Sequence, residues 1–341
     1  MRCLDEALVA LHRHAPEYAG GMADHGPMVV EALSALGRDD AVPTWLARYE
    51  PRLDPAPADG TEPSDWREAL GHLDRYPDLV ALTAREIDAD GWRATLRRWA
   101  PRLAPGLIGA AAHGVIRVGH ATRGLVAADT APRRRELAQA LAYWATTYHA
   151  LPVADGRPSG PPSHVLPDLP RMPRALRGDD FFITTAIERL HGYAPFASMI
   201  DAADAGGDPS PFLSDLSKAA ARAFLTNAGS GMLPLIAMVH TVTATAAARE
   251  IAAHVEPGVR RDVVRYAWQA VASLYVALGE ADPASAEQAS EKARQSPGFD
   301  VLLDRALGCG DEHAIKLVEA CAREHALDAD DAYAAAALEG V

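Results

Sequence analysis

The stretch Leu235-Ile236-Ala237-Met238-Val239-His240-Thr241-Val242 is the most apolar in the chain, and it predicts a helix buried at the centre of a helical protein. Residues 231–248 carry no formal charge when His240 is neutral, so the segment is also long enough to consider as a membrane span. Pro234, His240 and three threonines interrupt its apolar character, and charged residues follow within the helix expected over 230–254. A core helix is therefore the better interpretation.

Apolar residues recur at helical spacing on both sides of this segment. Toward the N-terminus they predict helices at 4–11, 29–36, 79–87, 92–99 and 137–148, and a further helix that carries 113–120. Toward the C-terminus they predict helices at 184–193, 211–227, 260–278, 284–294, 299–307, 312–325 and 329–338. Alanine, the best helix former, is abundant, and no convincing strand pair or fixed repeat is found. The sequence predicts an all-α fold.

Breaks rich in proline, glycine and aspartate divide the helices at 51–63, 152–180 and 206–211. The longest break is either a linker between two domains or a connection wrapped over one domain. We expect a single large multi-helix domain with long Pro-rich connections, in which the halves 1–151 and 181–341 converge on one site. Convergence of histidines from both halves would decide between the two interpretations.

Composition excludes several functional classes. The formal net charge of -13 argues against binding to nucleic-acid phosphates or to an anionic membrane surface, because both require clustered positive charge. Three cysteines (Cys3, Cys309 and Cys321) are too few for a disulfide framework or a four-thiolate zinc site, so we expect a cytoplasmic protein. The N-terminus lacks the basic start and apolar core of a signal peptide.

Recognisable cofactor and nucleophile motifs are also missing. The chain contains no Gly-x-x-x-x-Gly-Lys loop, no Gly-x-Gly-x-x-Gly after a predicted strand and no Gly-x-Ser-x-Gly. It also lacks His-Glu-x-x-His and any close cysteine pair. Nothing in the residues themselves therefore indicates a nicotinamide, a flavin, a phosphate loop or a serine hydrolase.

Thirteen histidines are present, and eight of them lie on charged helix faces, at helix ends or beside the Pro-rich break. The other five lie among apolar or small residues on four separate predicted helices or turns: His25, His113, His120, His240 and His313. Burying five imidazoles separately would be costly unless each had its own partner. Gathering them around one metal ion satisfies them together, as helical proteins commonly do with inward-facing side chains. Imidazole suits iron, zinc and copper.

Lys316 lies three residues after His313, on the same face of the predicted helix. It is one of only three lysines among 33 basic residues, so a chain that otherwise favours arginine retains a primary amine here. A neutral lysine reacts with carbon dioxide to give a carbamate, an anionic oxygen ligand that arginine cannot supply. Alternatively, Lys316 extends to solvent or pairs with Glu312. Asp24 and Glu312 each precede a histidine, and we expect them to support ligands rather than to coordinate.

At these histidines the sequence resembles the questin oxidase-like family, formerly a domain of unknown function, over nearly the whole chain. The resemblance rests on three blocks: Met22-Ala23-Asp24-His25-Gly26-Pro27-Met28, Pro105-Gly106-Leu107-Ile108-Gly109-Ala110-Ala111-Ala112-His113-Gly114-Val115-Ile116-Arg117 and Glu312-His313-Ala314-Ile315-Lys316-Leu317. The middle block is long and specific. The family includes fungal enzymes of secondary metabolism that oxidatively cleave anthraquinone rings in polyketide pathways.

One branch of that family is described as Baeyer–Villiger-type with NADPH, and another as a non-heme iron dioxygenase whose iron is held by four histidines and a carboxylated lysine. The resemblance implies that His25, His113, His240 and His313 hold Fe²⁺, with Lys316 as a carbamate that is also catalytic. His120 competes for a place among the ligands, or supports them and the catalysis. The connection after Pro51 is short, so substrate contacts of the fungal enzymes are not carried over.

The sequence thus favours a non-heme iron oxygenase that acts on a small aromatic or quinone-type, polyketide-like substrate with dioxygen, by ring cleavage or by Baeyer–Villiger-type oxygen insertion. NADPH enters only through the resemblance. Two alternatives stay open, namely a metal-free helical accessory protein that binds polyphenols and a zinc hydrolase at the same site. The aromatic residues that we expect as candidates for stacking on a flat substrate are Trp144, Tyr148, Phe181, Phe182 and Phe196.

Overall fold

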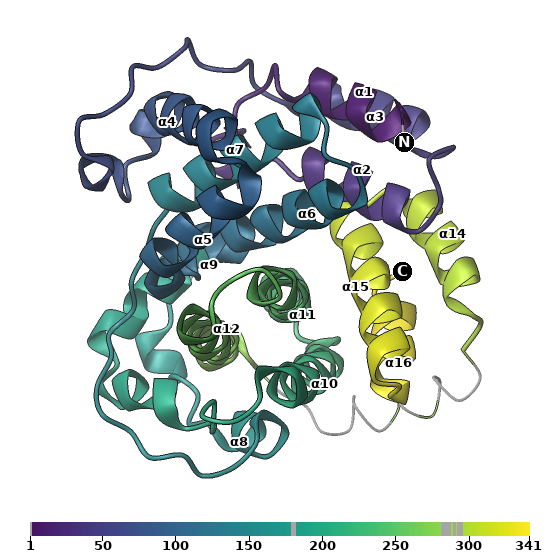
Figure 1. Ribbon diagram of the computed structural model, residues 1–341. Coiled ribbons are helices and arrows are strands. Elements are labelled where there is room, and N and C mark those ends of the chain that lie inside the picture. The colour runs from purple at the N-terminus through teal and green to yellow at the C-terminus, as the bar shows by residue number, and fades with distance from the viewer. Residues whose placement is uncertain (1, 179–181, 281–287, 289–290, 292–295) are drawn as a thin grey trace.

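The apolar segment around His240 forms helix α11 (Met232–Ala252), at the centre of the protein. By length and composition α11 resembles a membrane span, yet 67% of its most apolar window is buried within the computed structural model. It packs against α6 (His113–Ala127), α10 (Pro209–Asn227), α12 (Pro257–Leu278) and α15 (Glu312–Leu327). Figure 1 shows α10, α11 and α12 almost end-on, with α6 crossing beside them and α15 alongside. The expected core helix is present.

The structure describes residues 2–178, 182–280, 288, 291 and 296–341. The first half contributes α1 (Arg2–Leu11), α2 (Gly26–Ala35), α3 (Val42–Tyr49), α4 (Tyr76–Asp90), α5 (Trp92–Leu103) and α7 (Ala131–Thr146). The second half adds α8 (Pro162–Asp168), α9 (Ile183–Glu188), α14 (Phe299–Cys309) and α16 (Asp331–Glu339). The all-α class predicted from helical spacing is confirmed.

Two local predictions differ from the structure. A two-residue antiparallel pair, β1 (Glu17–Tyr18) with β2 (Met22–Ala23), precedes α2, although no strand pair was expected. Strands this short leave no alternating pattern in the sequence. The helix expected at 184–193 is divided into α9 and η7 (Arg189–Gly192), and η8 (Ala194–Asp201) follows it with Pro195 in its first turn. The helix expected at 284–294 lies outside the described residues, apart from positions 288 and 291.

The long Pro-rich connection runs over the surface of one domain instead of separating two. α8 lies within it and packs against α10 and α12 of the second half. After it, α9 packs against η5 (Gly109–Ala112), which belongs to the first half. Residues of both halves share one continuous apolar core.

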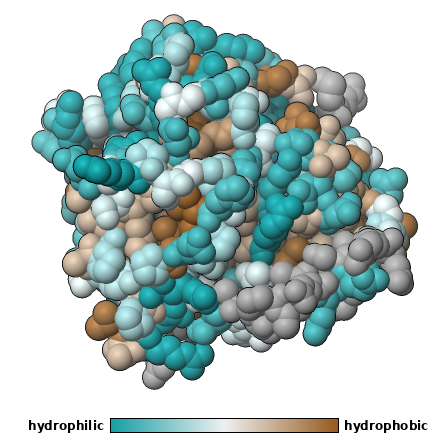
Figure 2. Space-filling view, turned by 90° about the horizontal axis from the view of Figure 1, so that it is seen from below, coloured by the Kyte–Doolittle hydropathy of each residue, from teal (hydrophilic) through white to brown (hydrophobic). Residues whose placement is uncertain are grey.

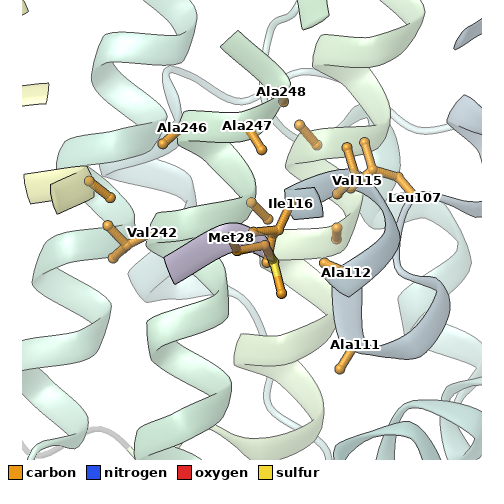
Figure 3. Packing of buried hydrophobic residues seen from close by; sticks show 14 of the residues in the cluster. Met28, Leu107, Ala111, Ala112, Val115, Ile116, Val242, Ala246, Ala247 and Ala248 are labelled. Carbon is orange, nitrogen blue, oxygen red and sulfur yellow. The ribbon is translucent and has the colours of Figure 1, made fainter. Parts of the chain in front are cut away.

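Small residues on α6 let its neighbours approach closely. A Cβ atom added at Gly114 would lie 2.6 Å from Cα of Trp144 in α7, and one added at Gly119 would lie 2.6 Å from Cβ of Ala247 in α11. Figure 3 shows Ile116 of α6 and Met28 of α2 meeting in front of α11, which contributes Val242 and Ala247. The small residues beside the histidines of α6 therefore allow other helices to approach closely.

The exterior is mainly hydrophilic on the face seen in Figure 2, where hydrophobic residues are scattered between polar ones. Basic and acidic side chains pair across helices on the surface, as Arg38 does with Asp304 and Lys218 with Asp328. Exposed pairs of this kind contribute little stability. The described part of the fold therefore depends mainly on its apolar interior.

Gly119→Ala tests the contact between α6 and α11. The added methyl would overlap Ala247, so we expect a loss of about 1–3 kcal/mol in the free energy of unfolding, measured by chemical denaturation. Gly308→Ala is the matched control, because Gly308 is also helical but nothing lies within 4 Å of its added Cβ. The control is expected to gain about 0.5–1 kcal/mol from helix propensity. Equal effects at the two positions would contradict the close packing described here.

Candidate metal centre

Four of the five singled-out imidazoles form a closed ring of contacts in the interior. The ring centroids of His25 and His113 are 4.7 Å apart, and those of His113 and His240 are 4.5 Å apart. His313 closes the circuit at 5.6 Å from His240 and 4.6 Å from His25. Ligand nitrogens of His25, His113 and His313 lie within 4.8 Å of one another. Histidines from both halves of the chain thus converge, as the single-domain interpretation requires.

Each histidine reaches this point from the start or the middle of a helix. His25 is the N-cap residue of α2, directly after the β1–β2 hairpin, and Pro27 occupies the first turn as expected. His113 is the first residue of α6, and His240 lies in the interior of α11. His313 belongs to the first turn of α15, which Asp311 caps by accepting hydrogen bonds from the His313 and Ala314 amides.

An unusual backbone segment presents His113. Ala110, Ala111 and Ala112 all adopt left-handed conformations, with φ of 48°, 56° and 70°. Each such residue costs about 1–2 kcal/mol when it carries a Cβ. The turn places the Ala110 carbonyl 2.5 Å from Nδ1 of His113. Nδ1 donates to this carbonyl, which leaves Nε2 as the free lone pair of the ring. Strain concentrated beside a potential ligand is typical of functional sites.

The nitrogens that meet here have no hydrogen-bond partners in the described structure. Nδ1 of His25, Nε2 of His113 and both ring nitrogens of His240 are buried and unsatisfied. Burial, followed by the charge of Lys316, holds the pKa of His25 well below its usual range and lowers that of His113 to about 3. Burial also lowers the pKa of His240, with His113 as the next cause. Neutral imidazoles with free lone pairs are the form that binds metal ions.

Lys316 extends into the same interior from α15. Its side chain is completely buried, and Nζ has no hydrogen-bond partner. Burial lowers the pKa of Lys316 from 10.5 to about 8, although Glu312 and Asp311 oppose this shift. Lys316 therefore neither reaches solvent nor forms the ion pair with Glu312 that was the alternative expectation. Glu312 instead interacts with Arg52.

His120 lies apart from the four rings. Its Nδ1 is 2.7 Å from Oε2 of Glu31, and Arg123 bonds both Glu31 and Glu319. Seven residues of helix separate His120 from His113, a rise of about 10 Å. His120 was expected to compete for a ligand position or to act in catalysis. Because Glu31 bonds Nδ1 of His120, we do not include His120 in the proposed metal centre. Burial lowers the pKa of His120, and the Glu31 carboxylate opposes that shift.

The two expected supporting carboxylates bond other groups than the imidazoles, Asp24 a backbone amide and Glu312 the side chain of Arg52. Oδ1 of Asp24 accepts from the Gly26 amide at 2.8 Å, and Tyr49 Oη accepts from the His25 amide at 2.6 Å. Burial raises the pKa of Asp24 to about 6. Arg52, held by Glu312, lies over the ring of Tyr49. Asp24 and Glu312 thus fix the chain around His25 and the start of α15 without touching the rings themselves.

A cavity of about 510 Å³ opens onto the four histidines. Its wall is mostly apolar and comes from the β1–β2 hairpin, the alanine turn, the start of α9 and the start of α11. A volume of this size suits a small organic ligand. The residues outside the histidine set that line it are Glu17, Gly20, Gly21, Met22, Ala23, Ala110, Ala111, Tyr143, Phe182, Ile183, Thr184, Met232, Leu233 and Ile236.

Sequence reasoning missed the polar pair of this cavity. Tyr143 Oη donates to Oε1 of Glu17 at 2.9 Å, and burial raises the pKa of Glu17. No local motif marks either residue, because 126 positions separate them. Of the aromatics expected to face a substrate, Phe182 lines the cavity, whereas Trp144 and Phe196 are buried core residues. Tyr148 packs on Gly106, and Phe181 lies outside the described residues.

Comparison with known proteins assigns no identity to this arrangement. No family model matches the chain, and no curated protein matches it. The geometry of the site therefore carries the functional argument, together with the resemblance described from the sequence.

Lys316→Met tests the burial of the amine in the metal-free protein. Because the folded-state pKa is about 8 and the unfolded value about 10.5, the unfolded state binds the extra proton between these limits. Wild-type stability should therefore rise with pH across this window, by up to about 3 kcal/mol. The variant should be more stable below pH 8, and the difference should shrink toward pH 10.5. Denaturation in chelator at several pH values measures it.

Lys218→Met is the matched control, because Lys218 is partly exposed and pairs with Asp328. It should show no comparable change in the pH dependence of unfolding. A pH-independent difference between wild type and Lys316→Met would contradict a buried amine with a lowered pKa.

Proposed function

We propose that this protein is a non-heme iron-dependent oxygenase that acts on an aromatic or quinone-type substrate. The observation that carries the proposal is the set of buried nitrogens without partners, on His25, His113, His240 and Lys316, which lie beside His313 at the end of an apolar cavity. The resemblance to the questin oxidase-like family supports iron over other ions that imidazole would accept. Oxygenation by ring cleavage and oxygen insertion of the Baeyer–Villiger type both remain within the proposal.

The donor set fits a metal ion by its chemistry. His25, His113, His240 and His313 would hold the ion, and their lowered pKa values keep His25, His113 and His240 neutral at physiological pH. The Ala110 carbonyl fixes the tautomer of His113, as the outer partners of metal-binding histidines commonly do. When bound, Fe²⁺ would supply the one-electron chemistry that dioxygen requires and that protein side chains cannot provide.

Lys316 would complete this set as a carbamate. Because burial lowers the pKa of Lys316 to about 8, roughly a tenth of this amine is the neutral nucleophile at pH 7, far more than for an ordinary lysine. Its nitrogen would attack the carbon of carbon dioxide, forming a C–N bond and releasing one proton. The product is an anion, which would offset the charge of an ion held by neutral imidazoles. A hard anionic oxygen beside imidazole nitrogen is a donor combination that suits iron.

The residues that line the cavity indicate which class of substrate it would bind. Phe182, Ile236 and Met232 offer apolar and aromatic surface for a flat ring, and water is excluded as the ring enters. Glu17 and Tyr143 supply the polar contact, and the raised pKa of Glu17 favours its protonated form. A protonated carboxyl can donate a hydrogen bond to a quinone carbonyl, and once it has transferred that proton the resulting carboxylate can accept one from a phenol. NADPH is part of the proposal only because one branch of the family that the sequence resembles is described with NADPH.

His240→Ala tests the metal centre. Both nitrogens of His240 are unpartnered, so its loss should remove iron from protein purified without added metal, as measured by elemental analysis. Oxygen consumption with a hydroxyquinone substrate should fall by at least about 100-fold. His254→Ala is the control, because His254 follows the same helix but packs on Trp92 at its far end. Wild-type protein that holds no transition metal and gains no oxygen uptake on adding iron would end the proposal.

The same measurements separate the two alternatives. Stoichiometric zinc without oxygen uptake would indicate a hydrolase at this site. Binding of a polyphenol that does not depend on any metal, and that weakens in both His113→Ala and His240→Ala, would indicate an accessory protein.

Lys316→Ala tests the carbamate. The variant should lose iron and activity, and short carboxylic acids such as acetate should restore part of both by replacing the missing anion. Wild-type protein equilibrated with ¹³C-bicarbonate should show a carbamate carbon in its NMR spectrum, and Lys316→Met should lack it. Full activity in carbon dioxide-free buffer, without such a resonance, would contradict the carbamate but leave the histidine centre intact.

A further inference from the structure

A second group of potential ligands lies outside the candidate metal centre. Nε2 of His149 is 3.1 Å from Nε2 of His191 and 3.4 Å from Oε2 of Glu188. The ligand atoms of all three residues lie within 4.8 Å of one another. His149 follows α7, Glu188 is the last residue of α9, and His191 belongs to η7. The sequence did not indicate this group, because His149 and His191 are 42 residues apart in the chain.

The spacing of these atoms matches the requirements of a tetrahedral ion. Zinc binds imidazole nitrogen and carboxylate oxygen at about 2.0–2.2 Å, so two ligand atoms at a tetrahedral angle are about 3.3 Å apart. The two measured separations, 3.1 Å and 3.4 Å, bracket that value. Two imidazoles and one carboxylate also leave a fourth position for water. A hydrogen bond between the two rings is the alternative that uses the same geometry without an ion.

We propose that His149, Glu188 and His191 form a second binding site for a divalent transition-metal ion of the zinc class. The side chains of His149 and Glu188 are 26% and 65% exposed, so the site accepts ions directly from solvent. Its donors differ from those of the buried centre, which has four imidazoles and a lysine. The site stands independently of the proposed oxygenase activity.

The proposed ion would fasten the two ends of the longest connection in the chain. His149 lies where the Pro-rich connection begins, and Glu188 and His191 lie just after it ends. A crosslink between such distant positions removes many conformations from the unfolded chain and thereby stabilises the folded one. The expected role of the site is therefore structural.

The same crosslink would support the wall of the cavity. α9 ends at Glu188 and begins at Ile183, which lines the cavity together with Phe182 and Thr184. On the other side, a Cβ added at Gly109 would lie 2.1 Å from the Thr147 carbonyl and 3.4 Å from the His149 amide nitrogen. The segment that holds His149 thus packs directly on the alanine turn that presents His113. The ion would fix the positions of these two cavity walls relative to each other.

Zinc titration of the His113→Ala/His240→Ala double variant tests the site, because this full-length protein lacks the buried centre. After treatment with chelator, it should bind one Zn²⁺ per chain by calorimetry and elemental analysis, and its melting temperature should rise with zinc. Adding His191→Ala should abolish both the binding and the shift. Adding His164→Ala should leave both unchanged, because His164 is exposed on α8 within the same connection but outside the cluster.

Circular dichroism checks that each variant is folded. Glu188→Gln replaces the carboxylate by a neutral side chain of the same shape. That variant should bind zinc more weakly, because it removes the anionic ligand. The proposal is overturned if the folded double variant binds no zinc, or if its zinc survives His191→Ala. Neither result bears on the iron content of the wild-type protein, so failure here and failure of the oxygenase proposal are distinguishable.

Discussion

The structure depends on one constraint, which is that five nitrogen donors lie in an apolar interior without hydrogen-bond partners. Leaving a buried polar group unsatisfied costs about 1–3 kcal/mol, and here several such groups occur at one point. Such a cluster persists only when the surrounding structure holds it in place. Four helices from both halves of the chain do so, and Gly119 of α6 allows α11 to approach it closely.

Two buried arginine–glutamate pairs follow the opposite rule. Arg117 binds Glu136 through two nitrogens, and Arg249 binds Glu324 in the same way. Burial disfavours the charge of Glu136, yet Arg117 lowers its pKa to about 2, so the pair stays ionised. These paired buried charges contrast with the buried imidazoles of His25, His113 and His240, which have nitrogens without hydrogen-bond partners.

Sequence reasoning reached most of the fold because helical periodicity is a local signal. The apolar run around His240 predicted α11, and the start of α15 at Glu312 was placed to the residue. The candidate site was reached less completely. Unusual neighbours marked His25, His113, His240 and His313, but the same criterion also selected His120, whose partner Glu31 is distant in sequence.

The structural features that the sequence could not predict depend on tertiary contacts or on backbone strain. Three alanines are good helix formers, so nothing about Ala110, Ala111 and Ala112 predicts left-handed conformations. Glu17 meets Tyr143, and His149 meets His191, only because the chain folds back on itself. In both cases each residue alone reads as an ordinary surface or core position.

The wide separation of the donors along the chain has a consequence for biosynthesis. His25 precedes α2, whereas His313 and Lys316 are both on α15. A polypeptide emerges from the ribosome with its N-terminal segments first. The nascent chain therefore exposes His25 and His113 well before their partners exist, and the full donor set cannot capture an ion until α15 has been made. Metal loading would then be a late event in maturation, through the open cavity of an otherwise folded protein.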